Sequence, residues 1–276
     1  MTAVLELDDL YYSYPGQDSQ ALKGASLAVP AGRKLVVVGR NGCGKSTLFL
    51  HCNGILKPDR GVVRVDGVPL SYDRRSILEL RRRVGIVFQS AEDQLFSASV
   101  AQDISFGPLN LGLSDAEVRT RVQAAAETCE IVDLLDRPVH ALSGGQKTRL
   151  ALAGVLAMDP QLLVVDEVLG NLDPWMQSQI VSVLQDLVDR GKSVLISSHD
   201  LGLARSWADV VVVMSEGRVI AADSPDRVFG DPALVSLICP ADAWDWRTPR
   251  DAVPAGGDTR RDGRGTKDFG RPGKGG

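Results

Sequence analysis

The segment Gly39-Arg40-Asn41-Gly42-Cys43-Gly44-Lys45-Ser46-Thr47 decides the fold of this chain, because it fits the pattern of a glycine-rich phosphate-binding loop. It lies between the apolar run Leu35 to Val38, typical of a buried strand, and a helical segment that starts near Lys45. Glycines let the backbone curl so that successive amide N–H groups point at phosphates, and the helix adds its positive N-terminal end. The pattern therefore predicts a nucleoside triphosphate site.

Two side chains of this loop have distinct expected roles. The Lys45 ammonium should reach the outer phosphates, and the Ser46 hydroxyl should complete the coordination of a Mg²⁺ ion. The expected nucleotide-binding residues are Gly39, Arg40, Asn41, Gly42, Cys43, Gly44, Lys45, Ser46 and Thr47. The competing interpretation, a chance glycine-rich turn, is disfavoured by the strand before the loop and the helix after it.

Composition places the chain among ordinary globular proteins. Its 276 residues can hold one large domain or two ordinary ones, and 44% hydrophobic residues suffice for a buried core. A net charge of −4 gives no basic footprint, so nucleic acid is not an expected partner. No apolar run approaches about 18 residues, and the acidic N-terminus lacks signal-peptide features, which predicts a cytoplasmic protein. The four cysteines lack metal-ligand spacing and are expected to be reduced.

Hydrophobic periodicity predicts the order of the elements. Strands are expected at residues 4–7, 26–29, 35–38, 61–65, 68–70, 83–88, 162–165, 194–197, 210–213 and 218–221, and a helix at 174–190. The first three strands should form a small β layer that leads to the phosphate loop, and the alternation after Pro160 predicts a parallel sheet. Residues 100–158 have helical spacing. One helical face would carry Val118, Val122, Ala125, Cys129 and Val132.

These elements predict an α/β fold. It would combine a phosphate-loop NTPase core with a mainly parallel sheet, an N-terminal antiparallel β subdomain and an inserted helical subdomain of about residues 91–159. The nucleotide-binding domain would span residues 1–235. Residues 240–276 contain eight glycines and 14 charged residues and are expected to be disordered, since so polar a segment cannot bury a core. Weak contact with an acidic lipid surface is the alternative to a solvated tail.

A buried strand downstream ends in two carboxylates. Leu162-Leu163-Val164-Val165-Asp166-Glu167 places both acids at the C-terminal edge of a parallel sheet, where such sheets bind ligands. Asp166 suits the metal ion. Glu167 suits the attacking water, because a carboxylate beside the γ-phosphate can orient or deprotonate it. Two acids can simply end a strand, but with the phosphate loop upstream they predict triphosphate hydrolysis.

The segment Leu142-Ser143-Gly144-Gly145-Gln146 precedes the helical run Lys147 to Met158 and makes a second anion-binding helix start. One nucleotide rarely needs two such starts from one subunit. The economical prediction is a dimer in which each ATP lies between the phosphate loop of one chain and Ser143, Gly144, Gly145 and Gln146 of the other. The alternative is a simple N-cap with a flexible entry.

Together these motifs resemble an ATP-binding cassette ATPase over roughly residues 4–230. The resemblance implies that Gln89 contacts the Mg²⁺ and the transport partner, and that Tyr14, easily confused with Tyr12, stacks on adenine. It also implies that Asp173 lies in the loop linking two subunits and that His199 contacts the γ-phosphate. Under this resemblance the catalytic residues are Lys45, Glu167 and His199, and the metal ligands are Ser46, Gln89 and Asp166.

The chain departs from that family after the catalytic glutamate. The family usually has Pro-Thr-Ser or Pro-Thr-Ala there, whereas this chain has Val168-Leu169-Gly170-Asn171-Leu172 before Asp173. Without proline the backbone is expected to be less restricted, and communication between the two nucleotide sites could differ.

The segments Ala91 to Phe96 and Phe106 to Leu113 are similar to those of ATPase subunits of energy-coupling factor importers, which serve cobalt, nickel and vitamins. This resemblance implies an ATPase on the cytoplasmic face of the cell membrane, held by a transmembrane coupling subunit that works with a substrate-binding membrane subunit. Asp93, Gln94, Leu95 and Phe96 are then the candidate docking residues, with a plain core role for Leu95 and Phe96 as the alternative.

Three alternatives stay open on the sequence. The dimer can be a homodimer or a heterodimer with a related ATPase, since one chain supplies both halves of the composite site. A soluble, mechanical ATPase of the same family would carry two cassettes or a long coiled-coil insertion, and this sequence has neither. A small-molecule kinase or GTPase would share the phosphate loop without the segment Leu142 to Gln146. The sequence does not indicate the transported solute.

Overall fold

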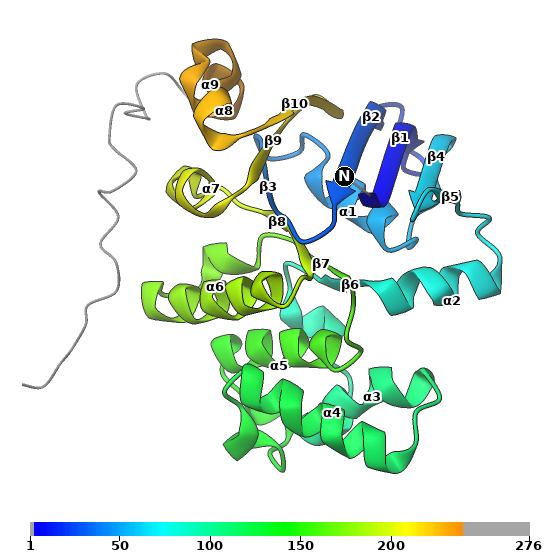
Figure 1. The fold of residues 1–276 in the computed structure, drawn as a ribbon, viewed down its shortest axis with the longest axis vertical. Coiled ribbons are helices and arrows are strands. Elements are labelled where there is room, and N and C mark those ends of the chain that lie inside the picture. The colour runs from blue at the N-terminus through cyan, green and yellow to red at the C-terminus, as the bar shows by residue number, and fades with distance from the viewer. Residues whose placement is uncertain (1–2, 240–276) are drawn as a thin grey trace, which may run out of the picture.

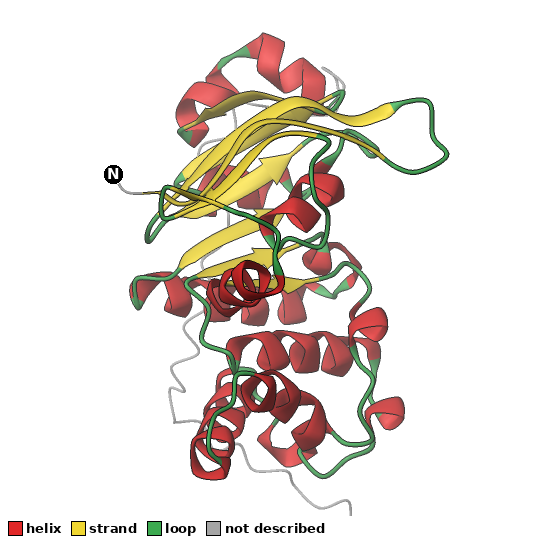
Figure 2. Cartoon of the chain, turned by 90° about the vertical axis from the view of Figure 1, so that its right-hand side faces the viewer, coloured by secondary structure: helices red, strands yellow, loops and turns green. Residues whose placement is uncertain are grey.

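The computed structural model describes residues 3–239, in which two β-sheets are stacked and helices gather beyond one edge of them (Figures 1 and 2). The expected tail, residues 240–276, lies outside the described residues. The elements in chain order are β1 (Ala3–Ser13), β2 (Gln20–Pro30), β3 (Lys34–Val38), α1 (Lys45–Cys52), β4 (Arg60–Val65), β5 (Val68–Pro69), α2 (Arg74–Arg83), β6 (Val84–Val87), α3 (Val100–Asn110), α4 (Asp115–Thr128), α5 (Gly144–Leu156), β7 (Leu162–Val165), α6 (Pro174–Asp189), β8 (Ser193–Ser197), α7 (Leu201–Trp207), β9 (Val210–Ser215), β10 (Arg218–Asp223), α8 (Pro225–Gly230) and α9 (Pro232–Ile238).

The larger sheet has the strand order β10-β9-β3-β8-β7-β6 and is parallel from β9 to β6. Strand β3 lies inside it, with Val36 opposite Ile196 of β8 and Val211 of β9. The strand β10 was expected to continue the parallel pattern, and that expectation is wrong: β10 pairs antiparallel with β9. The turn between them, at Glu216 and Gly217, is too short for the crossover that a parallel pair needs.

The smaller sheet has the order β2-β1-β4-β5 and is antiparallel throughout. The predicted antiparallel β subdomain is therefore present, but residues 35–38 do not belong to it as expected, because they form β3 of the larger sheet. Apolar side chains of both sheets and of α1 make one core cluster, including Leu5, Leu22, Leu35 and Phe49, all fully buried. This packing fixes the antiparallel sheet against the strand that leads to the phosphate loop.

Helices α3, α4 and α5 pack against one another and occupy the lower part of Figure 1, as the helical spacing predicted. Their contacts join a second core cluster in which Ile104, Ala126 and Leu150 are fully buried. The helical face predicted to be buried wrongly included Val132, which is 41% exposed. Helix α4 ends at Thr128, and a positive φ of 53° at Glu130 turns the chain away before Val132 is reached.

Helices α2, α7, α8 and α9 were not predicted from the sequence. Helix α2 projects at the right of Figure 1, beside the β4–β5 hairpin, and begins with an Asp73 cap whose carboxylate accepts from Arg75 N and Ser76 N. Burial of Leu80 holds its inner face on the larger sheet's side. Across residues 3–239, none of the helices is both long and apolar enough to span a bilayer.

Candidate active site

The phosphate loop connects the buried strand β3 to α1, which begins at Lys45, so the first amides of α1 face the loop. Gly42 and Gly44 have φ values of +77° and +107°, which side chains rarely adopt. A Cβ on Gly44 would also lie 2.8 Å from Ala21 O, and one on Gly39 would collide with Met214 O. Close packing against β2 therefore requires Gly44 and close packing against β9 requires Gly39, whereas at Gly42 only the positive φ favours glycine.

The turn between β9 and β10 holds the loop from outside. Gly217 N donates to Cys43 O at 2.9 Å, and Lys23 N of β2 donates to Gly217 O at 2.8 Å. Burial raises the pKa of the Cys43 thiol, although neighbouring Lys45 opposes that shift. Cys43 therefore stays a neutral thiol packed beneath the loop.

Lys45 and Glu167 meet across this loop. The Lys45 side chain is buried, and its Nζ donates to Gly39 O at 3.0 Å and lies 3.1 Å from Glu167 Oε1. This ion pair brings the predicted phosphate ligand to the predicted water-activating carboxylate, residues far apart in sequence. Each of the two charges is the other's counterion.

Glu167 collects two further donors. His199 Nε2 lies 2.9 Å from Glu167 Oε1, and Gln89 Nε2 lies 3.2 Å from Glu167 Oε2. The backbone of Glu167 has a positive φ of 48°, and its N–H donates to Ser197 Oγ at 2.8 Å. The same Ser197 hydroxyl donates to Asp166 Oδ1 at 2.7 Å, so Ser197 positions both acids. The sequence analysis missed Ser197, and its only signal was its place beside His199 at the end of β8.

A cleft of about 490 Å³ opens above the loop. Its lining residues are Tyr14, Gln17, Ser19, Gln20, Ala21, Asn41, Gly42, Gly44, Lys45, Ser46, Thr47, Gln89 and Glu167. Tyr14 Oη lies 3.2 Å from Thr47 Oγ1, while Tyr12 is 9% exposed and packs edge-on against Tyr14 at 5.1 Å between ring centroids. Of the two tyrosines, Tyr14 is therefore the one able to meet a base.

The residues assigned to the metal are all oxygen donors: the Ser46 hydroxyl, the Gln89 amide oxygen and the Asp166 carboxylate. Magnesium prefers oxygen ligands and usually takes one or two carboxylates together with water and phosphate oxygens, so the donor set fits it. Within residues 3–239 no group of three or more His, Cys, Asp or Glu side chains could hold a metal ion. Ser46, Gln89 and Asp166 would hold Mg²⁺ together with phosphate oxygens of a bound nucleotide.

The predicted site residues that do not line this cleft are Gly39, Arg40, Cys43, Asp166, His199, the segment Ser143 to Gln146, and Asp173. Ser143 caps α5, with its Oγ accepting from Gln146 N at 3.3 Å and its own N–H donating to Gln146 Oε1 at 2.9 Å. Asp173 caps α6, with Oδ1 accepting from Met176 N at 3.0 Å. Within this chain, the capping alternative describes Ser143 and Gln146 correctly.

The unusual segment after Glu167 is held firmly. Val168 and Leu169 are buried, and the Gln177 amide donates to both Leu169 O and Leu172 O at 3.0 Å. In place of proline, apolar burial and the Gln177 amide restrain this part of the backbone.

The structure narrows the candidate docking residues. Gln94 turns inward, where its side chain bonds Phe88 N at 3.2 Å and Ile86 O at 3.1 Å, and Leu95 packs on the core. Asp93 is exposed, and Phe96 is 64% exposed and packs edge-on against Phe106 at 4.6 Å. An apolar, aromatic surface therefore remains beside the segment that carries Gln89.

Comparisons with known proteins identify the family of this chain. The family described as ABC transporter matches residues 22–170. The energy-coupling factor transporter ATP-binding protein EcfA of Methanosphaera stadtmanae is 43% identical over 235 residues, 85% of this chain and 84% of that protein. The cobalt import ATP-binding protein CbiO of Rhodobacter capsulatus is 46% identical over 236 residues, 86% of this chain and 84% of that protein.

A solved structure of CbiO1 from Clostridium perfringens, described as part of the ABC transporter complex cbiONQ, has a TM-score of 0.75 and 42% identity, covering 85% of this chain and 93% of that one. These matches confirm the predicted α/β class, because the similar chain adopts the same fold over nearly its whole length. They also extend well beyond the phosphate loop, through the Ser143 segment and the paired acids. The chain belongs to the ATP-binding proteins of ABC transporters, related to EcfA and CbiO, and is an ATP hydrolase.

Proposed function

We propose that the chain is the ATPase subunit of a membrane importer and that two protomers enclose each ATP. The observation that carries this proposal is the placement of two anion-binding helix starts on different parts of one chain. The phosphate loop lines the cleft, whereas Ser143, Gly144 and Gly145 do not. A second protomer would bring its Ser143 segment over the first protomer's γ-phosphate.

Gly144 supports this arrangement independently. A Cβ built on Gly144 would meet no atom within 4 Å, and Gly144 is not among the residues with positive φ, so this chain's own packing does not require glycine there. A glycine helps when another backbone or a ligand comes close. The exposed start of α5 is thus suited to approach by a phosphate bound to another chain.

Within such a site the residues of this chain would have separate roles in binding phosphate, orienting water and holding the metal ion. Lys45 would leave Glu167 and bind the outer phosphates, and the freed Glu167 carboxylate would orient the attacking water. His199 would hold its contact near the γ-phosphate. The Mg²⁺ held by Ser46, Gln89 and Asp166 would neutralise charge on the phosphate oxygens when bound.

The composite site is tested with Ser143→Arg. Isothermal titration of ADP should show an affinity unchanged from the parent chain, because Ser143 does not line the cleft. ATP-dependent dimerisation of the Glu167→Gln chain, followed by light scattering, should disappear when Ser143→Arg is added. Thr120→Arg, at an exposed position of α4, is the control and should dimerise. Loss of ADP affinity in Ser143→Arg, or its normal dimerisation, would contradict the composite site.

We further propose that the surface of Asp93, Phe96 and Phe106 receives a helix of a transmembrane subunit, at the cytoplasmic face of the membrane. The support is the exposed aromatic pair next to Gln89, which links docking to the nucleotide site. The name of the Rhodobacter capsulatus relative, a cobalt import ATP-binding protein, supports import of a metal ion, and the resemblance to energy-coupling factor importers adds a vitamin as the other class of cargo. A substrate-binding membrane subunit would complete the complex.

This docking is tested by co-purification from detergent-solubilised membranes. Asp93→Lys combined with Phe96→Ala should reduce recovery of membrane subunits while ATP affinity stays unchanged. Ile220→Ala is the matched control, since Ile220 is 46% exposed on β10, at the opposite end of the molecule in Figure 1. Equal recovery with both variants would refute the docking surface.

A further inference from the structure

The outer face of α2 carries a cluster of positive charge that no described carboxylate neutralises. Arg74, Arg75, Arg81 and Arg82 are exposed, and within residues 3–239 none of them forms an ion pair. At about 100° per residue, these four arginines and Leu78 fall within an arc of about 120° on one side of the helix. We call these five residues the arginine face; Leu78 in its middle is 50% exposed.

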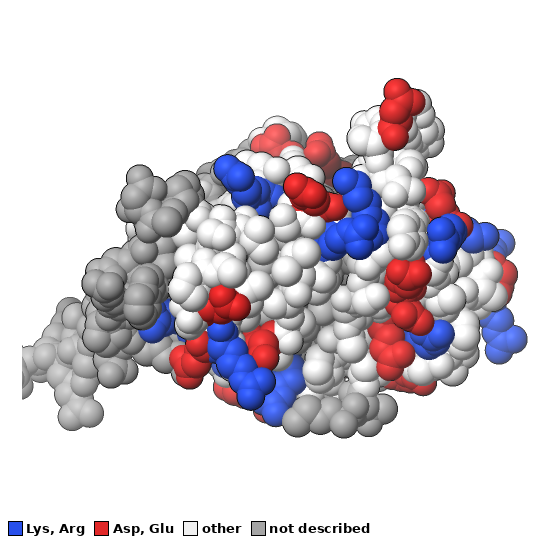
Figure 3. All heavy atoms as spheres, turned by 90° about the horizontal axis from the view of Figure 1, so that it is seen from above, with Lys and Arg blue, Asp and Glu red and all other residues white. Residues whose placement is uncertain are grey.

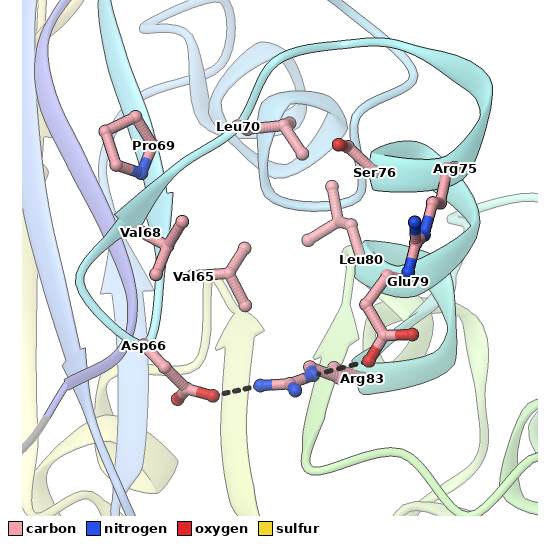
Figure 4. Close-up of a pocket in the computed structure, with 10 residues that line it drawn as sticks. All are labelled: Val65, Asp66, Val68, Pro69, Leu70, Arg75, Ser76, Glu79, Leu80 and Arg83. Carbon is pink, nitrogen blue, oxygen red and sulfur yellow. Dashed lines mark hydrogen bonds and ion pairs between the residues drawn. The ribbon is translucent and has the colours of Figure 1, made fainter.

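The fifth arginine of α2 has a different task. Arg83 points the other way and pairs with Asp66 of the β4–β5 turn and with Glu79, as Figure 4 shows. It closes one end of a groove between that hairpin and α2, whose apolar wall includes Val65 and Leu80. Arg83 thus has a structural role in joining α2 to the β4–β5 turn, whereas the arginines of the arginine face form no such ion pairs within residues 3–239.

Helix stability does not explain the arginine face either. Arg81 and Arg82 are in the last turn, where positive charge favours the helix, but Arg74 and Arg75 are in the first turn, where it opposes the helix dipole. The whole chain has a net charge of −4, and on the face shown in Figure 3 acidic and basic side chains intermingle. A one-sided basic helix is therefore a local exception.

The arginine face also forms a shallow hollow of about 420 Å³. Arg74, Arg75 and Arg82 line it together with Leu78 and Glu79. The Glu79 carboxylate is engaged by Arg83 Nε at 3.1 Å, which leaves the three guanidinium groups as its donors to an outside ligand. Guanidinium groups match phosphate oxygens in pairs, so the hollow fits a phosphate group.

We propose that the arginine face binds the headgroups of anionic phospholipids. The positive charges stand at both ends of the helix, about 12 Å apart along its axis, with an apolar side chain between them. That is the arrangement of a helix lying on a membrane surface, with arginines at the headgroups and Leu78 toward the acyl chains.

The position of α2 supports lipid over an acidic protein segment. Arg82 Nη2 donates to Leu111 O at 3.4 Å, which puts the arginine face beside the end of α3, where Phe106 and Leu109 are about half exposed. These side chains adjoin the surface proposed above for a membrane subunit. The lipid proposal goes beyond that one and can be tested without it, because a vesicle contains no protein.

The experiment is flotation of the full chain with vesicles of phosphatidylcholine alone and with phosphatidylglycerol added. The test variant replaces Arg74, Arg75, Arg81 and Arg82 with Gln. The control variant replaces Arg119, Arg137, Arg190 and Arg218 with Gln, exposed residues outside α2, and so has the same net charge. Equal ATP affinity of both variants would show that both are folded.

The parent chain and the control variant should bind the anionic vesicles and should not bind the vesicles of phosphatidylcholine alone. The test variant should lose about fivefold in partition coefficient per arginine, on the order of several hundred-fold in all if the four act additively. Raising salt from ~0.1 M to ~1 M, which shortens the screening length from ~10 Å to ~3 Å, should release the parent chain. Leu78→Ala should weaken binding in low salt.

Two results would overturn the proposal. Equal binding by test and control variants would assign any lipid affinity to another part of the chain. The second result is that the parent chain binds a polyglutamate peptide tightly but does not bind anionic vesicles, and that the test variant loses the peptide binding. This result would assign the arginine face to an acidic protein segment instead.

Discussion

The Lys45–Glu167 ion pair predicts that Glu167→Gln makes the chain bind ADP more tightly. Lys45 Nζ lies 3.1 Å from Glu167 Oε1, and the Lys45 side chain is only 3% exposed. Lys45 must give up this partner before it can bind a phosphate. Glutamine keeps the shape of the side chain but removes its charge, which raises the free energy of the nucleotide-free state relative to the bound one.

The magnitude follows from the kind of bond that is lost. The bare Coulomb energy at this distance is about 5 kcal/mol at an effective dielectric constant of about 20, an upper bound because desolvation opposes it. A hydrogen bond to a charged group contributes about 1.5–3 kcal/mol net, and a neutral acceptor gives roughly half of that. The substitution should therefore shift binding by about 0.7–1.5 kcal/mol, or about three- to twelvefold in Kd.

Isothermal titration with ADP is the appropriate assay, because ADP lacks the γ-phosphate and avoids both hydrolysis and closure of the dimer. A double-mutant cycle isolates the pair: Lys45→Ala should weaken ADP binding, and Glu167→Gln should give no gain in the Lys45→Ala background. An unchanged ADP affinity in Glu167→Gln, or the same gain in both backgrounds, would refute the competition between Glu167 and phosphate for Lys45.

Three further predictions concern the loop and the cores. Gly44→Ala should abolish ATP binding measured by titration, because φ is +107° and the new Cβ would lie 2.8 Å from Ala21 O, whereas Gly42→Ala, with open space around it, should bind measurably. Leu150→Ala should lower the free energy of unfolding in urea by about 2–5 kcal/mol; a loss below about 1 kcal/mol would mean that the α5 core collapses around the gap. Burial lowers the pKa of His51 below 6.5, so the unfolded chain binds its proton more readily. The His51 contribution to the free energy of unfolding is then complete above about pH 6.5 and falls below that pH by up to about 1.4 kcal/mol per pH unit. If urea unfolding gave the same difference in free energy between the parent chain and His51→Gln at every pH, this prediction would be contradicted.

The features that the sequence predicted are those with a local signal. The phosphate loop has its glycines at fixed spacing, β7 is a continuous apolar run, and α6 begins at Asp173-Pro174, a cap followed by proline at the first turn. The conformation of each of these segments is determined by residues close to it in the sequence. The antiparallel pairing of β1 with β2 follows similarly from the short connection at residues 14–19, whereas β4 pairs with β1 only after the chain has formed β3 and α1.

What the sequence did not predict depends on distant or polar residues. Strand β1 was expected at 4–7 but extends to Ser13, because the ladder continues past a bulge at Asp9, where φ is 51°. Helix α2 has a single buried residue, Leu80, so its pattern is dominated by arginines. The bridging role of Ser197 exists only because β7 and β8 are neighbours, which places its hydroxyl on Asp166 from the next strand.

The position of β3 in its sheet has a consequence for how this protein is made. Its two sheet neighbours are β8 and β9, and Gly217 N donates to Cys43 O; all three lie more than 150 residues after β3 in the sequence. A ribosome therefore releases the nucleotide loop long before it releases the strands that fix its shape. We expect the growing polypeptide to acquire ATP only after β9 and β10 have emerged from the exit tunnel, so that nascent chains stay inactive until these two strands are available.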